Sequence, residues 1–175
     1  MTLAPTIETP RLELRGHLPS DLPDSIRMWQ SPETIRFIGG RPLTEEEVWL
    51  RLLRYWGGWA MLGYGFWRIV ERATGRFVGE IGFHELHRDS QPSFAGEPET
   101  GWALMAEFHG RGFAREALDA VLAWGDAHIE AGRTVCIIHP ANAASLKLAR
   151  AVGYADLGDL AYKGGTMVLL GRDRP

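Results

Sequence analysis

The hydrophobic pattern of the chain changes period several times, and each change marks a new element. Residues 11–15, Arg-Leu-Glu-Leu-Arg, alternate polar with apolar positions, which predicts a strand with one buried face. Runs with a period of two, or with apolar residues throughout, return from Gly65 onward. The strands that they predict are 66–70, 77–83, 100–105, 134–138 and the two arms of a closing hairpin, 154–162 and 166–170.

Segments with a helical period separate these strands. Thr44 and Glu47 have the spacing of a capping box, so a helix should start here, and we expect Gly57-Gly58 to end it. Asn142 is a good N-cap for a later helix, and Gly153 suits its C-terminus. The helices predicted in this way cover about 20–29, 31–37, 45–58, 113–130 and 142–152.

The order of these elements predicts the fold class. The order β-α-α-β-β-β-α-β-α-β-β indicates a single α/β domain with a mixed sheet, spanning residues 1–175 with a core over about 8–172. The strand 134–138 is too uniformly apolar to have a solvated face, so we expect it to lie centrally. The loop 87–98 is long for a compact domain, and loops of this length are commonly functional or mobile.

Composition and charge exclude several classes of protein. Of the 175 residues, 45% are hydrophobic, which is enough for a core at this length. Nineteen basic residues against 22 acidic ones give a net charge of −3, so we expect neither nucleic acid nor an anionic membrane as a partner. The chain contains no apolar run long enough to span a membrane, and its start does not resemble a signal peptide, so the expected location is the cytoplasm. Its single cysteine, Cys136, excludes an intrachain disulfide and a Cys-rich zinc site, and we expect no metal.

A glycine-rich loop between a strand and a helix is the strongest local signal for chemistry. It reads His109-Gly110-Arg111-Gly112-Phe113-Ala114. The two glycines let the backbone approach a ligand closely, and the following helix offers unbonded N–H groups and the positive end of its dipole. Arg111 would add a charge-assisted contact. The loop therefore fits a pyrophosphate, although the same residues also suit a plain tight connection.

A second signal lies in the helical segment after Pro140. Ser145 falls in the middle of a helix face that also carries Leu148 and Val152. A hydroxyl on an inward face needs a partner, which is either a bond back to the carbonyl of Ala141 or a reacting group. From these residues alone, the bond to Ala141 is the favoured interpretation.

The glycine-rich loop and the helical segment after Pro140, together with other segments, resemble the GNAT superfamily of acyl-CoA-dependent N-acyltransferases. The resemblance is strongest to its ribosomal-protein N-terminal acetyltransferase branch. The similar segments occur in the family's order over nearly the whole chain, which is more specific than any one of them. They are 9–15, 79–82, 99–104, 109–117, and 142–145 with 152–154.

The resemblance implies a V-shaped mixed sheet, splayed between the fourth and fifth predicted strands, with acetyl-CoA as co-substrate in the opening. The pantetheine arm would pair with the backbone of Leu104, Met105 and Ala106. The pyrophosphate would bind the amides of Gly110 to Ala114, which agrees with the independent interpretation of that loop. Asn142 would contact the cofactor or line its channel. His109 stands where the family usually has Gln or Arg, so we expect weaker help from this side chain.

The resemblance also implies an enzyme that moves an acetyl group from acetyl-CoA to a primary amine by direct transfer in a ternary complex. Glu99 matches the family's glutamate and is the candidate base; its alternative is a solvated carboxylate at a loop end. Ser145 matches the position that protonates the departing thiolate, and Tyr154 is the alternative acid. Backbone N–H groups near Met105 would stabilise the oxyanion.

Several points stay open at this stage. A non-catalytic acyl-CoA-binding or regulatory module would keep the glycine loop and lose the acid and the base, whereas a flavodoxin-like nucleotide binder conflicts with the terminal hairpins. The acceptor is a small-molecule amine or a peptide or protein N-terminus, and the protein is a monomer or a homodimer. One or two members of an aromatic group are expected to shape the acceptor pocket. This group comprises Trp56, Trp59, Tyr64 and Trp67.

Overall fold

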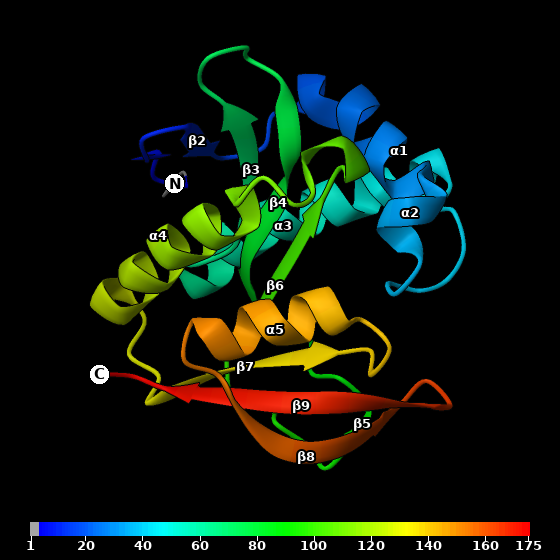
Figure 1. The fold of residues 1–175 in the computed structure, drawn as a ribbon, viewed down its shortest axis with the longest axis vertical. Helices are drawn as coiled ribbons and strands as arrows, with labels where there is room; N and C mark the ends of the chain where they lie inside the picture. The colour runs from blue at the N-terminus through cyan, green and yellow to red at the C-terminus, as the bar shows by residue number, and fades with distance from the viewer. Residues whose placement is uncertain (1–3) are drawn as a thin grey trace.

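A single open sheet organises the protein. The computed structural model describes residues 4–175 and orders the strands β1-β2-β3-β4-β6-β7-β9-β8-β5 (Figure 1). All neighbouring strands are antiparallel except β6 and β7, which are parallel. The strands are β1 (Ile7–Glu8), β2 (Leu12–Arg15), β3 (Phe66–Glu71), β4 (Phe77–His84), β5 (Ser90–Gln91), β6 (Glu99–Leu104), β7 (Arg133–Ile138), β8 (Ala155–Tyr162) and β9 (Gly165–Asp173).

Helices cover both faces of the sheet. In Figure 1, α4 and α5 lie in front of the strands and α3 lies behind them. The helices are α1 (Leu22–Gln30), α2 (Pro32–Ile35), α3 (Glu45–Leu62), α4 (Phe113–His128) and α5 (Ala143–Ala151), with short 3-10 helices at Pro19–Asp21 and Ala106–Phe108. No helix in the part of the chain described here has the length and apolar character needed to cross a membrane.

The sheet opens between β6 and β7. The register joins these two strands at a single residue pair, Glu99 with Val135, and the N–H of Val135 donates to the carbonyl of Pro98 at 3.0 Å. Beyond this pair the strands diverge, as Figure 1 shows. The predicted α/β class, the central position of β7 and the splayed mixed sheet are thereby confirmed.

One helix boundary was predicted wrongly. The helix α3 runs through Gly57 and Gly58 to Leu62, and Gly63 ends it in the left-handed conformation (φ 77°). A Cβ atom on Gly58 would lie only 3.0 Å from the carbonyl oxygen of Tyr64, so a glycine is needed where the chain turns back toward β3. The glycine that seemed to end the helix therefore serves tertiary packing, and local propensity is overridden.

Two short strands were missed, and several local predictions hold. The strands β1 and β5 have two residues each, and β5 pairs with β8, so it anchors part of the long loop before β6. The capping box of α3 forms, with the Thr44 hydroxyl accepting from the Glu47 N–H. The hairpin β8–β9 turns at Lys163 and Gly164, which both have positive φ.

Candidate active site

The glycine-rich loop presents a row of unbonded amides at the start of α4. Gly110 and Gly112 are both left-handed, with φ of 71° and 79°, and α4 begins directly after them at Phe113. Within residues 4–175, the N–H groups of residues 110–115 have no hydrogen-bond partner, whereas the Glu116 N–H donates to the Gly112 carbonyl. Consecutive amides at a helix N-terminus attract an anion. The loop geometry is thus suited to phosphate groups.

Two arginines border this loop, and each is already engaged. Arg111 donates from Nη2 to Glu71 at 3.0 Å, at the end of β3. Arg11 binds Glu116 through Nε at 2.6 Å and donates from Nη1 to the Arg111 carbonyl at 2.9 Å. The guanidinium of Arg111 therefore braces the loop against β3, in addition to any contact that it makes with an anion.

The β6 edge beside the opening has unpaired backbone groups. The N–H of Met105 donates to the Val78 carbonyl at 2.9 Å, so this amide belongs to the β4–β6 ladder and is not available to an oxyanion. Backbone groups alternate in direction along a strand, so those of Trp102 and Leu104 point toward the opening. The Leu104 carbonyl there accepts from His109 Nε2 at 3.0 Å. Ala106 starts the 3-10 helix that leads to the loop.

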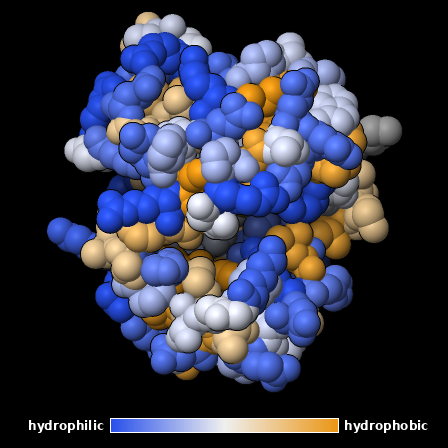
Figure 2. Space-filling view, turned by 90° about the vertical axis from the view of Figure 1, so that its right-hand side faces the viewer, coloured by the Kyte–Doolittle hydropathy of each residue, from blue (hydrophilic) through white to orange (hydrophobic). Residues whose placement is uncertain are grey.

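His109 thus has an observed role within the chain. Its ring bonds the last carbonyl of β6 and fixes the path from the strand to the glycine loop. The opening itself is visible from the side of α1 and α2, where Figure 2 shows a recess across the middle of the surface.

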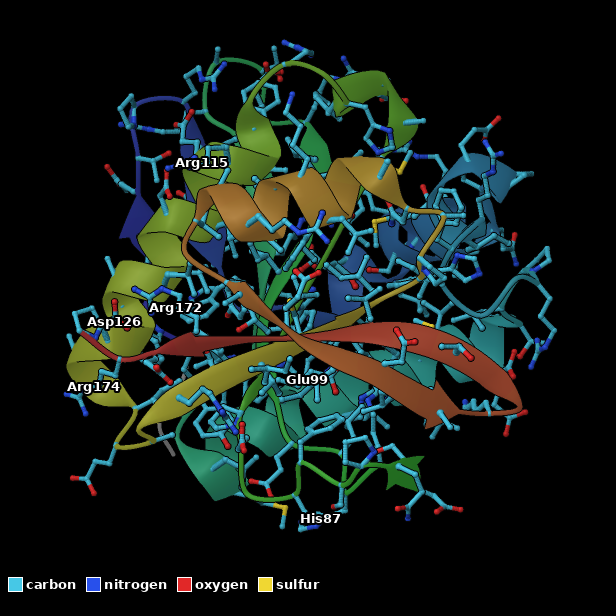
Figure 3. All side chains as sticks on the ribbon, turned by 60° about the horizontal axis from the view of Figure 1, so that its bottom comes forward. His87, Glu99, Arg115, Asp126, Arg172 and Arg174 are labelled. Atoms are coloured by element: carbon cyan, nitrogen blue, oxygen red, sulfur yellow. The ribbon has the colours of Figure 1, made fainter. Side chains whose placement is uncertain are left out.

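Glu99 lies at the closed end of the opening and is held by an ion-pair network. The residue is 4% exposed, and its carboxylate accepts two bonds from Arg88, at 2.5 and 2.9 Å. His84 Nε2 lies 3.1 Å from the same carboxylate. Burial alone would raise the pKa of Glu99, but His84 and Arg88 outweigh it and hold the pKa below its usual value. Figure 3 shows Glu99 in the middle of the molecule, far from Arg115 on α4 and from His87 in the loop.

The solvated-carboxylate alternative for Glu99 does not describe the structure, because the side chain is buried and paired. Glu97 instead lies nearer to solvent and binds Arg133 with two bonds, at 2.7 and 2.8 Å. Arg88 was not singled out from the sequence. It stands in an irregular loop, and only the folded chain brings it to Glu99.

Ser145 is half-buried near the start of α5, and its hydroxyl is unbonded. Its backbone N–H donates to Asn142 Oδ1 at 3.2 Å, which confirms Asn142 as the N-cap. Within residues 4–175 the hydroxyl has no hydrogen-bond partner, and the expected bond to Ala141 is absent. The amide nitrogen of Asn142 and the Ser145 hydroxyl are both available to a ligand.

Tyr154 is a core residue that links the two diverging strands. It is 3% exposed, and its hydroxyl bonds Thr100 of β6 at 2.7 Å and Thr134 of β7 at 2.8 Å. Burial raises its pKa far above the usual value. The geometry therefore favours Tyr154 as a packed aromatic that closes the base of the opening.

Changing Tyr154 to Phe separates a structural role from an acid role. We expect the free energy of unfolding to fall by about 1 kcal/mol, because the two threonine hydroxyls lose their shared partner. We expect turnover to stay within about twofold of wild type, because the tyrosine hydroxyl is buried and is already shared between the two threonines. Thermal unfolding and initial rates measure the two effects. A loss of turnover of about 100-fold with unchanged stability would instead identify Tyr154 as the acid.

The aromatic group expected near the acceptor pocket belongs largely to the core. Trp59, Trp67 and Trp124 pack edge to face, with ring centroids 4.6 to 5.4 Å apart. Trp56 is half-buried and donates to the His17 carbonyl at 2.7 Å. These contacts indicate a structural role for the group.

Comparisons with known proteins agree on one family. The family model described as "Acetyltransferase (GNAT) domain" matches residues 11–155. An uncharacterized N-acetyltransferase of Bacillus subtilis (strain 168), YoaA, is 26% identical over 166 residues, which is 93% of this chain and 91% of that protein.

Solved structures show the same likeness. One, assigned to the GnaT acetyltransferase family and coming from Bordetella pertussis, is 33% identical, with a TM-score of 0.85 over 96% of this chain and 99% of that one. RimL, a ribosomal L7/L12 alpha-N-protein acetyltransferase solved in complex with coenzyme A, shares the fold at 17% identity, with a TM-score of 0.78 over 97% of this chain and 98% of that one.

Proposed function

Because the chain belongs to the GNAT acetyltransferase family, we propose that it moves the acetyl group of acetyl-CoA to a primary amine by direct attack in a ternary complex. The observation that supports this most is the row of unbonded N–H groups over residues 110–115, next to an open strand edge on β6. An anionic head and an extended amide-bearing arm are the two features that such a surface suits. The acceptor is a small amine or a peptide or protein N-terminus.

The residues present suit the pyrophosphate and the pantetheine arm of acetyl-CoA. The amides of Gly110 to Ala114 would bind the pyrophosphate. The backbone of Trp102 and the N–H of Leu104 would pair with the pantetheine arm, because the Leu104 carbonyl already accepts from His109 and Thr34. The amide nitrogen of Asn142 lies on the facing helix, where it would donate to the arm. The co-substrate supplies an activated thioester, so the protein needs no covalent intermediate of its own.

Glu99 is our candidate for the group that takes the proton from the acceptor ammonium. Its lowered pKa keeps it ionised throughout the neutral range. A carboxylate offers about four lone-pair sites, so the fork of Arg88 leaves acceptor capacity for the ammonium or a bridging water. The two bonds from Arg88 fix the orientation of the carboxylate, which is what a base at a reacting centre requires.

Ser145 is our candidate for the group that protonates the departing thiolate, and its variant tests this. Ser145→Ala should lower kcat by about 10- to 100-fold with little change in acetyl-CoA affinity, because only the proton donor is lost. Ser20→Ala removes an exposed hydroxyl far from α5 and should behave as wild type. Initial rates and calorimetry measure the two effects, and an unchanged kcat for Ser145→Ala would contradict the assignment.

Two measurements test the proposed function as a whole. Calorimetry with acetyl-CoA and with CoA should show binding, and a screen of amines, peptides and polyamines should show acetyl transfer to at least one acceptor. Binding without turnover on any acceptor would favour a non-catalytic acyl-CoA-binding module. The absence of any binding at high micromolar ligand would remove both functions.

A further inference from the structure

Three arginines lie on the face of the sheet that α3 covers, one of them bound to Glu99 and the other two beside Tyr55 of α3. We call Arg51, Arg54 and Arg88 the arginine cluster. Arg51 and Arg54 lie one turn apart on α3, and Arg88 comes from the loop after β4. Arg51 and Arg54 both flank Tyr55: Arg51 donates to its hydroxyl at 3.3 Å, and the guanidinium carbon of the exposed Arg54 lies 5.7 Å from the centroid of its ring.

A stack of rings ties this part of α3 to the candidate base. Tyr55 stacks on Phe66 with ring centroids 4.5 Å apart, and Phe66 stacks on His84 at 5.1 Å. His84 in turn lies 3.1 Å from the Glu99 carboxylate, and the charges of Arg54 and Arg88 both lower its pKa, after burial. These ring contacts therefore connect the two arginines beside Tyr55 with the position where the acceptor amine would meet Glu99.

Two members of the cluster have no carboxylate partner. Most arginines of this chain lie within 4.0 Å of a carboxylate, and Arg88 does so through Glu99. Within residues 4–175, no such pair involves Arg51 or Arg54. The charge of Glu80 helps to raise the pKa of Arg51, but within the described residues no ion pair joins the two, and the Glu80 oxygens accept from three donors on α1 and α3. These donors are Ser25, Trp29 and Tyr55.

The geometry of Arg51 leaves its donors available to a ligand. Its guanidinium carbon lies over the Trp29 ring, 3.9 Å from the centroid, and one nitrogen donates to the Tyr55 hydroxyl at 3.3 Å. Its Nε is buried and has no partner in the part of the chain described. A buried donor without a partner is costly, so a ligand that accepts from it gains binding energy. Arg54 makes no hydrogen bond or ion pair within the described residues.

We propose that Arg51 and Arg54 form an anion subsite that binds a carboxylate on the amine acceptor. This inference rests on the proposed acetyl transfer and names the class of its acceptor. Planar guanidinium groups bind carboxylates with two parallel bonds, so the subsite would hold the acceptor while its amine faces Glu99. The preferred acceptors are then free amino acids or peptides with an acidic residue beside the terminal amine. Polyamines are disfavoured, because they would bring positive charge to the cluster.

Acceptor pairs that differ only in charge test the subsite. One pair is an amino acid and its amide. The other pair is two short peptides that differ only in their second residue, which is Asp in one and Asn in the other. We expect kcat/KM to be at least about tenfold higher for the acid of at least one pair, because charge-assisted bonds are the strong ones. The two pairs distinguish a free amino acid from an acidic peptide N-terminus.

The variants Arg51→Gln and Arg54→Gln should remove this preference by raising KM about tenfold or more for the acid alone, with kcat nearly unchanged. Arg27→Gln is the matched control, because Arg27 is an exposed arginine of α1 that pairs with Asp24. Calorimetry of the N-acetylated acid with the CoA-loaded protein should show the same loss in Arg54→Gln. The melting curve of Arg54→Gln and its acetyl-CoA affinity should match wild type, because Arg54 is exposed, and this keeps folding and cofactor binding separate from acceptor binding.

Equal kcat/KM within both pairs, or a preference for polyamines, would overturn the subsite while leaving the acetyltransferase proposal intact. A weakened acetyl-CoA affinity in Arg54→Gln would also overturn it, because the cluster would then belong to the cofactor site. The absence of transfer to every amine would contradict the acetyltransferase proposal itself, and the subsite with it.

Discussion

Replacing Gly112 by valine is expected to abolish acetyl-CoA binding, with the dissociation constant rising by at least about 100-fold. Gly112 has φ of +79°, a conformation that a β-branched residue adopts only under strain. A Cβ atom would also lie 3.3 Å from Arg11 Nη2, so the arginine that braces the loop would have to move. The amides of the loop would then lose the orientation that phosphate groups need.

The fold should survive the Gly112→Val change, because the residue is exposed and lies in a loop. Gly132→Val is the matched control: Gly132 is exposed, has no positive φ, and a Cβ there would meet nothing within 4 Å. Calorimetry with acetyl-CoA measures the affinity, and a melting curve measures the fold. A Gly112→Val protein that binds acetyl-CoA as wild type would show that the pyrophosphate lies elsewhere.

The glycine loop could be predicted from the sequence because its geometry is local. Two glycines before a helix determine where left-handed residues and unbonded amides occur, and both appear as expected. The end of α3 could not be predicted in this way. Gly58 looks like a helix terminator, but it is a contact point for the carbonyl of Tyr64, and that contact exists only in the folded chain.

The surroundings of Glu99 show the same limit for the candidate site. Its place at the head of β6 followed from the strand pattern, and the resemblance marked it as a base. Its partners did not follow, because Arg88 and His84 reach it from a loop and from a neighbouring strand. Spacing along the chain carries no information about such pairs, so the sequence left a solvated carboxylate open as the alternative for Glu99, whereas the structure has a buried ion pair.

Replacing Glu99 by glutamine is expected to lower the rate of acetyl transfer by at least about 100-fold at neutral pH. The amide keeps the shape of the side chain but cannot take a proton from the acceptor ammonium. Acetyl-CoA affinity should stay near wild type, because the glycine loop and the β6 edge are unchanged. The rate should recover partly at high pH, where the free amine forms without a base.

The ion pair gives the same substitution a second consequence for stability. The pKa of Glu99 is lower in the folded state than in the unfolded state. The ionised carboxylate therefore stabilises the fold at pH values above its unfolded pKa, and this stabilisation is lost as the pH falls through the pKa of the folded state. At neutral pH, Glu99→Gln should therefore lower the melting temperature, because Arg88 keeps its charge in a mostly buried place. The melting-temperature difference between the two proteins should shrink at pH values below the usual pKa of a carboxyl group.

Rates must be compared well below the melting temperature of both proteins, so that the loss of the ion pair does not pass for loss of the base. Glu97→Gln is the matched control, since Glu97 stands two residues earlier, binds Arg133 and is partly exposed. It should leave both the rate and the pH–rate profile unchanged. If Glu99→Gln kept the wild-type pH–rate profile while its melting temperature fell, Glu99 would be a structural partner of Arg88, and the base would have to be sought on another residue.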